Sequence, residues 1–101
     1  MTLAYIICKD AVEAENISMR LLKKRLIACA NMFPIRSMYW WKNKIVNDME
    51  YLMIAKTNDK NFKKAAAEVK KLHSYGIPCI LKIEATANKE YEEWAKKEMR
   101  R

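Results

Sequence analysis

Glycine is almost absent from this chain of 101 residues, which excludes one class of binding loop. Gly76 is the only glycine, whereas a phosphate-binding loop needs several glycines so that its backbone can curl around the phosphate oxygens. The sequence also contains no G-x-S-x-G, H-E-x-x-H or G-x-x-x-x-G-K-S/T motif. We therefore expect no catalytic residues and no enzymatic activity.

Long hydrophobic runs are absent as well. The longest, Leu3 to Cys8, is far shorter than the roughly 20 residues that a membrane-spanning helix needs. The first residues have no basic segment followed by a long apolar stretch, so we expect no signal peptide and a cytoplasmic location. The three cysteines are an odd number, and in a reducing compartment we expect free thiols.

Acidic residues are fewer than basic ones, which gives the chain a net charge of +8. The lysines and arginines are scattered along the sequence, mostly on the outer faces of expected helices, where charged side chains are ordinary. We therefore interpret most of this charge as solvated surface.

The apolar pattern predicts a single domain over residues 1–101, because half of the chain is hydrophobic and chains of this length rarely divide. The order of elements is strand, helix, two strands, helix, strand and an extra C-terminal helix, which is an α+β, ferredoxin-like βαββαβ arrangement. The expected elements are strand 3–8, helix 11–26, strands 29–41 and 44–57, a helix after Asn58 or Asp59, strand 79–85 and a short helix after Asn88.

Four local signals mark the boundaries of these elements. Asp10 followed by Glu13 is typical of a capping box at a helix start. Asn43 tolerates the positive φ that a tight hairpin turn requires. Pro34 indicates a bulge or a sheet edge within its strand, and Gly76 indicates the C-cap of the second long helix.

The two long strands form a hairpin that is apolar on both faces. Its tip carries the aromatic residues Tyr39, Trp40 and Trp41. An apolar hairpin left in water would promote aggregation, so we expect a partner subunit to cover it. Aromatic residues dominate such interfaces, and we interpret these three as interface anchors.

Three segments resemble the CutA family, the divalent-cation-tolerance proteins. RLIACANMFPIRSMYWWKNKIVNDMEYLMIAKT resembles that family's long central hairpin, LHSYGIPCI resembles its L-H-P-Y-E-x-P-E-I segment, and EYEEW resembles its closing Y-x-x-W. The resemblance covers essentially the whole chain. It implies a ferredoxin-like homotrimer, similar in build to the PII signalling proteins, that responds to metal ions and binds copper, with Cys29 and His73 at matched positions.

The resemblance is incomplete at the ligand-bearing segment. Ser74 replaces the family's proline, and Gly76 and Cys79 replace its two glutamates. Loss of both carboxylates disfavours an oxygen-rich cation site, whereas thiols and imidazole suit Cu(I). There is no Cys-x-x-Cys pair and only one histidine, so no zinc site of standard spacing is expected.

Other interpretations of these residues remain open. The cysteines are also typical of buried small hydrophobic residues, and a Cys–His pair could act as a nucleophile if the fold brought its members together. A PII-like scaffold would instead bind a small ligand or a partner protein between subunits. Trp40, Lys56 and Tyr75 would then offer a cation and aromatic faces to a small anion.

Nucleic-acid binding is a third interpretation, because the RNA-recognition module shares the βαββαβ order. That module needs aromatic residues in a K/R-G-F/Y-G/A-F-V-x-F/Y run, which this chain lacks. In this chain, Tyr5 and Tyr51 are the only aromatic residues on the expected central strands.

We accordingly predict only nonspecific binding of RNA. A random RNA oligomer at physiological salt should bind no tighter than a Kd of roughly 10⁻⁴–10⁻⁶ M, because a scattered charge supplies only counterion release. A salt series followed by fluorescence anisotropy measures this, and a sequence-dependent nanomolar affinity would contradict it.

Overall fold

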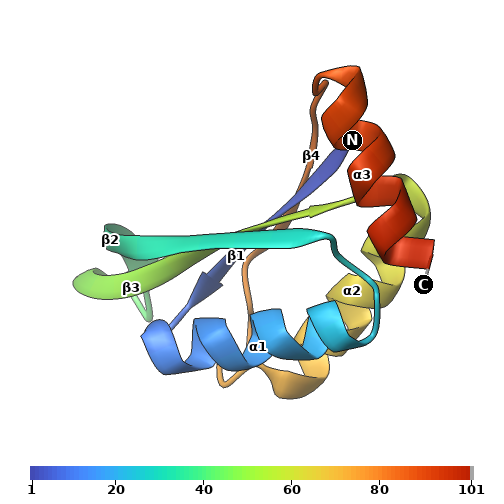
Figure 1. Cartoon of the computed structure of the whole chain (residues 1–101). Coiled ribbons are helices and arrows are strands. Elements are labelled where there is room, and N and C mark those ends of the chain that lie inside the picture. Colours follow the sequence, from blue (N-terminus) through green and yellow to red (C-terminus); the bar gives the residue numbers. More distant parts are fainter. Residues whose placement is uncertain (101) are drawn as a thin grey trace.

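Four antiparallel strands form the framework of the protein, described for residues 1–100 by a computed structural model (Figure 1). This arrangement confirms the predicted α+β class. The elements in chain order are β1 (Thr2–Cys8), α1 (Ala11–Lys23), β2 (Cys29–Trp41), β3 (Lys44–Thr57), α2 (Asp59–Leu72), β4 (Ile80–Glu84) and α3 (Lys89–Arg100).

The strand order is β2-β3-β1-β4, so β1 is a central strand with β3 on one side and β4 on the other. Thr2 of β1 lies opposite Thr57 of β3 and Cys8 lies opposite Tyr51. The strand order β2-β3-β1-β4 is the ferredoxin-like topology that the sequence predicted. In the described residues, no helix is both long and apolar enough to cross a membrane.

Helices α1 and α2 cover one face of the sheet, which we call the helix face (Figure 1). The opposite face is called the open face, and α3 lies across the end of the sheet where β1 begins. The core lies between sheet and helices and contains Ala4, Ile6, Cys8, Met53 and Ala55 from the strands and Ala14, Ile17, Leu21, Ala65 and Val69 from the helices. Burial alternates along β1, as expected for a strand with one covered face.

Side-chain caps begin the two long helices as the sequence predicted. The Asp10 carboxylate accepts a hydrogen bond from the backbone N–H of Glu13 at 2.9 Å, and Asn58 does the same for Asn61 at 2.8 Å. The hairpin turn is also as expected, because Asn43 has a φ of 63°. Its neighbour Lys42 has a φ of 49°, and two consecutive positive φ values are those of a type I′ turn.

The helix ends differ from the sequence expectation. Helix α1 ends at Lys23 rather than near residue 26, because Arg25 adopts a left-handed φ of 59°. The backbone N–H of Leu26 then donates to the carbonyl of Leu21 at 3.0 Å, which closes a Schellman motif. Helix α2 ends at Leu72 with His73 as its C-cap, so the predicted capping role of Gly76 is wrong.

Of the two roles predicted for Pro34, the structure selects the sheet edge. Strand β2 is the outer strand, and its pairing with β3 runs without interruption from Cys29 opposite Lys56 to Trp41 opposite Lys44. Proline lacks an N–H to donate, and an edge strand tolerates that loss. Strand β4 begins at Ile80, one residue later than expected.

The outer half of the β2–β3 hairpin projects beyond the helices (Figure 1). Its apolar side chains are exposed, with Trp40 72% accessible. The other exposed apolar residues of this half are Met38, Tyr39, Trp41, Ile45 and Met49. A projecting apolar surface of this size fits the expectation of a partner subunit, which stays a prediction.

Candidate metal site and ligand cleft

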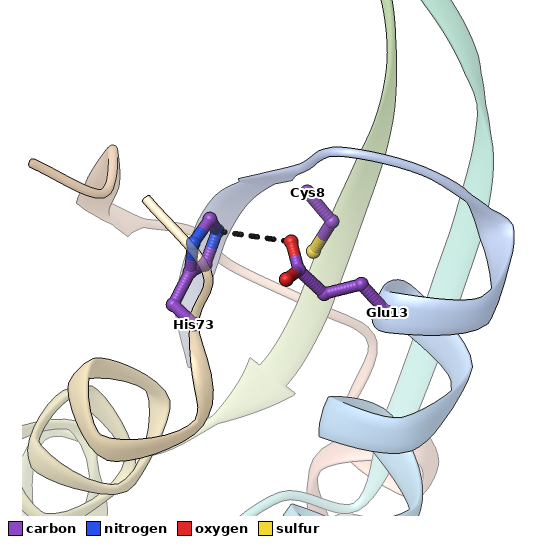
Figure 2. A group of neighbouring side chains, drawn as sticks. All are labelled: Cys8, Glu13 and His73. Atoms are coloured by element: carbon purple, nitrogen blue, oxygen red, sulfur yellow. Dashed lines mark ion pairs between the residues drawn. The ribbon is translucent and has the colours of Figure 1, made fainter. Parts of the chain in front are cut away.

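Three potential metal ligands meet where β1 ends and α2 ends. Cys8 is the last residue of β1, Glu13 lies in the first turn of α1, and His73 follows α2 (Figure 2). One donor atom of each residue lies within 4.8 Å of the other two. Cys8 and the side chain of His73 have no exposed surface, and the side chain of Glu13 is 8% exposed.

Glu13 occupies this position because of the helix cap. Its carboxylate turns back over the start of α1 and accepts from the backbone N–H of Lys9 at 2.9 Å. The second carboxylate oxygen accepts from the backbone N–H of Ser74 at 3.1 Å. Glu13 therefore joins the segment after β1 to the segment after α2.

Two backbone groups orient the His73 ring. Its Nδ1 accepts from the backbone N–H of Tyr75 at 3.1 Å, and its Nε2 lies 2.6 Å from the carbonyl oxygen of Ile7. A carbonyl only accepts, so Nε2 carries the proton and the ring is the neutral Nε2–H tautomer. The same Nε2 lies 3.6 Å from a Glu13 oxygen.

Burial and charge act differently on the two acids of this cluster. Burial raises the pKa of Cys8 to about 12, with further contributions from the charges of Glu13 and Asp10. Burial also tends to raise the pKa of Glu13, but the hydrogen bonds from Lys9 and Ser74 outweigh it and lower that pKa. The thiol is thus protonated at neutral pH and unreactive, which argues against the Cys–His nucleophile.

The predicted metal pair, Cys29 and His73, does not meet within one chain. Cys29 lies opposite Lys56, which lies opposite Leu3 in β1, whereas His73 contacts Ile7. Four residues of strand separate Leu3 from Ile7, about 13 Å at ~3.3 Å per residue. Sequence reasoning missed Cys8 and Glu13 as members of the cluster, although a cysteine ending a strand and a capping glutamate were both visible.

A cleft of about 740 Å³ lies on the open face, between the outer half of the hairpin and the segment 74–79. Of the predicted cleft residues, only Tyr75 lines it. Trp40 alternates with Tyr39 and Trp41 and points to the other side of the strand. Lys56 lies six residues from Glu50, at the far end of β3, with its Nζ 5.3 Å from the ring of Tyr91.

The cleft is lined instead by aromatic and apolar residues together with one carboxylate. Its lining residues are Ile7, Ser37, Met38, Tyr39, Trp41, Glu50, Ser74, Tyr75, Gly76, Ile77 and Cys79. Lys56, the cation predicted for a cleft between subunits, is absent from the lining of this cleft within one chain.

The aromatic pair that RNA recognition would need is split between the two faces. Tyr51 packs against the core on the helix face. Tyr5 lies opposite Ile54, three residues from Tyr51 along β3, and so points to the open face. No two-base stacking platform forms on the central strands.

Comparison with known proteins is consistent across the whole chain. The family described as CutA1 divalent ion tolerance protein matches residues 2–98. The divalent-cation tolerance protein CutA of Archaeoglobus fulgidus is 45% identical over 91 residues, 89% of each chain. That of Thermotoga maritima is 45% identical over 96 residues, covering 93% of this chain and 94% of the relative.

Solved structures agree with the sequence matches. The structure described as the periplasmic divalent cation tolerance protein CutA from Archaeoglobus fulgidus superimposes with a TM-score of 0.95 over 98% of this chain and 99% of its own, at 42% identity. The PII-like protein CutA from Nostoc, in apo form, gives a TM-score of 0.90 over 98% and 97% of the two chains. At 24% identity, this second likeness concerns the fold.

Replacing Glu13 tests its role in joining the two segments. We expect Glu13→Ala to lower the free energy of unfolding at pH 7 by about 1–3 kcal/mol, because two backbone N–H groups lose their acceptor. A lowered pKa means that the carboxylate stabilises the fold above its ordinary pKa of 4.5, and that this contribution is lost as the pH falls through the folded value.

The difference between wild type and Glu13→Ala should therefore shrink below about pH 4.5. Urea denaturation across a pH series measures it, with Glu15→Ala as the control, since Glu15 is exposed on the same helix. If Glu13→Ala lowers the free energy of unfolding at pH 7 no more than Glu15→Ala does, Glu13 does not join the two segments as described.

Proposed function

This chain belongs to the CutA1 divalent ion tolerance protein family, and from that premise we propose that it binds a soft metal ion at Cys8, Glu13 and His73. The observation that carries this proposal is the convergence of three donor atoms of different residues within 4.8 Å. The ion we propose is copper, and the proposed role is a response to metal ions.

The chemistry of the donors favours a soft ion over a hard one. A thiolate and an imidazole are preferred ligands of Cu(I). Calcium takes six to eight oxygen ligands, and magnesium takes six, whereas this cluster offers one carboxylate. Glu13 would balance charge and hold the other two donors in place.

Binding requires changes in the cluster that can be stated from its hydrogen bonds. Cys8 must lose its thiol proton. The proton of His73 must move from Nε2 to Nδ1, with loss of the contacts to the Ile7 carbonyl and the Tyr75 N–H, before Nε2 donates to a metal. Metal uptake would therefore release the thiol proton, and affinity would rise with pH. Because the donors are buried, part of the surrounding structure must move aside during entry of the ion.

Binding rather than catalysis is the activity we propose. The relatives are named for divalent-cation tolerance, and the thiol nearest to His73 is buried and has a raised pKa. A buried, protonated thiol is a poor nucleophile. The cytoplasm remains the proposed location, supported by three free cysteines, although one relative is described as periplasmic.

We also propose that the protein works as a homotrimer. The exposed apolar half of the hairpin supports assembly, because such a surface is unfavourable in water. The number three follows from the resemblance to the CutA family. A PII-like scaffold that binds a small ligand is the second candidate function, and the cleft beside Tyr75 is the observation that favours it.

Copper titration of cysteine variants tests the metal site. We expect Cys8→Ala to weaken Cu(I) binding at least about 10-fold, because it removes the soft ligand. Cys29→Ala is the matched control and should change the affinity less than about 2-fold. Competition with a chromophoric Cu(I) chelator measures both, and Mg²⁺ and Ca²⁺ should not displace the copper.

His73→Ala should weaken Cu(I) binding as Cys8→Ala does. Alkylation of the cysteines in the unfolded protein, followed by refolding, should abolish Cu(I) binding. Circular dichroism establishes that each variant is folded. Equal copper affinity for wild type and Cys8→Ala would contradict the site, and a loss confined to Cys29→Ala would place it elsewhere.

Sedimentation equilibrium tests the assembly. We expect a single species of about 36 kDa, three times the 12.0 kDa of one chain. Replacing Trp40 and Trp41 together by Ser should weaken it, since buried aromatic anchors commonly cost about 2 kcal/mol or more each. Trp94→Ser is the control, because this half-exposed tryptophan lies on α3. A 12 kDa species of the wild type at micromolar concentration would contradict the trimer.

A further inference from the structure

The single histidine of the chain is held in a tautomer that opposes metal binding. Nε2 of His73 faces a carboxylate oxygen of Glu13 across 3.6 Å (Figure 2). The same nitrogen carries the ring proton, which it donates to the carbonyl of Ile7 at 2.6 Å. An imidazole nitrogen binds a metal ion through its lone pair, and the protonated Nε2 has none to offer. The contacts around the ring therefore favour the metal-free state.

The backbone N–H of Tyr75 determines which ring nitrogen carries the proton. It donates to Nδ1 of His73 at 3.1 Å, and Nδ1 must stay an acceptor while this N–H points at it. A histidine that binds metal through one nitrogen almost always donates the N–H of the other nitrogen to an acceptor. Here the group beside Nδ1 is itself a donor, so a proton on Nδ1 would face the N–H of Tyr75. This N–H must leave Nδ1 before Nε2 can bind a metal ion.

The side chain of Tyr75 is fixed at its far end by the sheet. Its hydroxyl donates to the carboxylate of Glu50 on β3 at 2.6 Å, and Glu50 is buried. A hydrogen bond to a carboxylate is one of the stronger hydrogen bonds in proteins. The ring of Tyr75 also contacts that of His73, with the ring centroids 4.8 Å apart. Because a tyrosine side chain has only two flexible torsions, the backbone of Tyr75 cannot move far while the hydroxyl stays bound.

We propose that Tyr75 is a positioning residue of the metal site, and that its hydrogen bond to Glu50 keeps the site closed while no metal is bound. This inference rests on the proposed function of Cys8, Glu13 and His73. The bond stabilises the arrangement in which the N–H of Tyr75 contacts Nδ1 and the proton stays on Nε2. Metal uptake must break that arrangement, so the bond lowers the population of the binding-competent state and with it the apparent affinity.

The tautomer can be measured directly on the metal-free wild type, because the chain has one histidine and its ring signals need no assignment. A long-range ¹H–¹⁵N correlation spectrum distinguishes a protonated ring nitrogen from an unprotonated one. We expect the proton on Nε2 of His73 and a lone pair on Nδ1. A proton on Nδ1, alone or together with one on Nε2, would overturn the proposal, since Nδ1 could then accept nothing from Tyr75.

Tyr75→Phe removes the hydroxyl but keeps the ring and the backbone N–H. We expect amide hydrogen exchange at residue 75 of the metal-free variant to be at least about 10-fold faster than in the wild type, because the bond to Glu50 no longer holds this N–H on Nδ1. The amide of His73 donates to the carbonyl of Val69 at the end of α2. It is the internal reference, and its exchange rate should change less than about 2-fold.

The affinity for Cu(I) should rise in this variant, whereas a merely structural loss would lower it. We expect Tyr75→Phe to bind Cu(I) at least about 10-fold more tightly than the wild type in competition with a chromophoric chelator, because less free energy is needed to open the site. Tyr91→Phe is the matched control, since Tyr91 lies on α3 and its ring contacts Trp94 and Lys56. It should change the Cu(I) affinity less than about 2-fold.

The two measurements separate this proposal from the metal site on which it rests. A Tyr75→Phe variant that binds Cu(I) as the wild type does, or more weakly, would overturn the role of Tyr75. If neither protein binds Cu(I), the metal site itself is wrong. Faster exchange at residue 75 would then still support the hold of Tyr75 on His73, and an unchanged rate would overturn it.

Discussion

The carboxylate of Glu13 holds together the two segments from which both candidate sites are built. It accepts hydrogen bonds from the backbone of Lys9, after β1, and of Ser74, after α2. On one side of Ser74 the imidazole of His73 enters the metal cluster, and on the other side the phenol of Tyr75 enters the cleft. A buried carboxylate is stable only while its hydrogen bonds are made, so the position of this segment depends on one side chain.

Most of the fold was predictable because its signals are local. Short segments rich in apolar residues marked the strands, and the short polar side chains of Asp10, Asn43 and Asn58 marked two helix starts and one turn. The end of α1 was not predictable in the same way. A left-handed residue is signalled by glycine or asparagine, and here Arg25 takes that conformation within a Schellman motif that its own backbone hydrogen bonds close.

The sites were predicted less well, because they depend on contacts between residues far apart in the chain. His73 and Tyr75 were singled out in the sequence beside a helix end, and they lie in the donor cluster and in the cleft, respectively. The positions of the other predicted residues depend on the register of the strands. The pairing of β2 with β3 places Cys29 and Lys56 opposite each other at one end of the sheet, away from the cluster and the cleft. Glu13 was recognised as part of a helix cap, but no sequence pattern indicates its contact with Ser74, which is 61 residues away.

Localising the metal in crystals tests the central claim most directly. An anomalous difference map at the copper absorption edge, from crystals of the protein loaded with Cu(I), shows the ion without reference to any variant. The account predicts one peak per chain, in contact with the sulfur of Cys8 and the imidazole of His73. A peak at Cys29 or Cys79, with none beside Cys8, would contradict it.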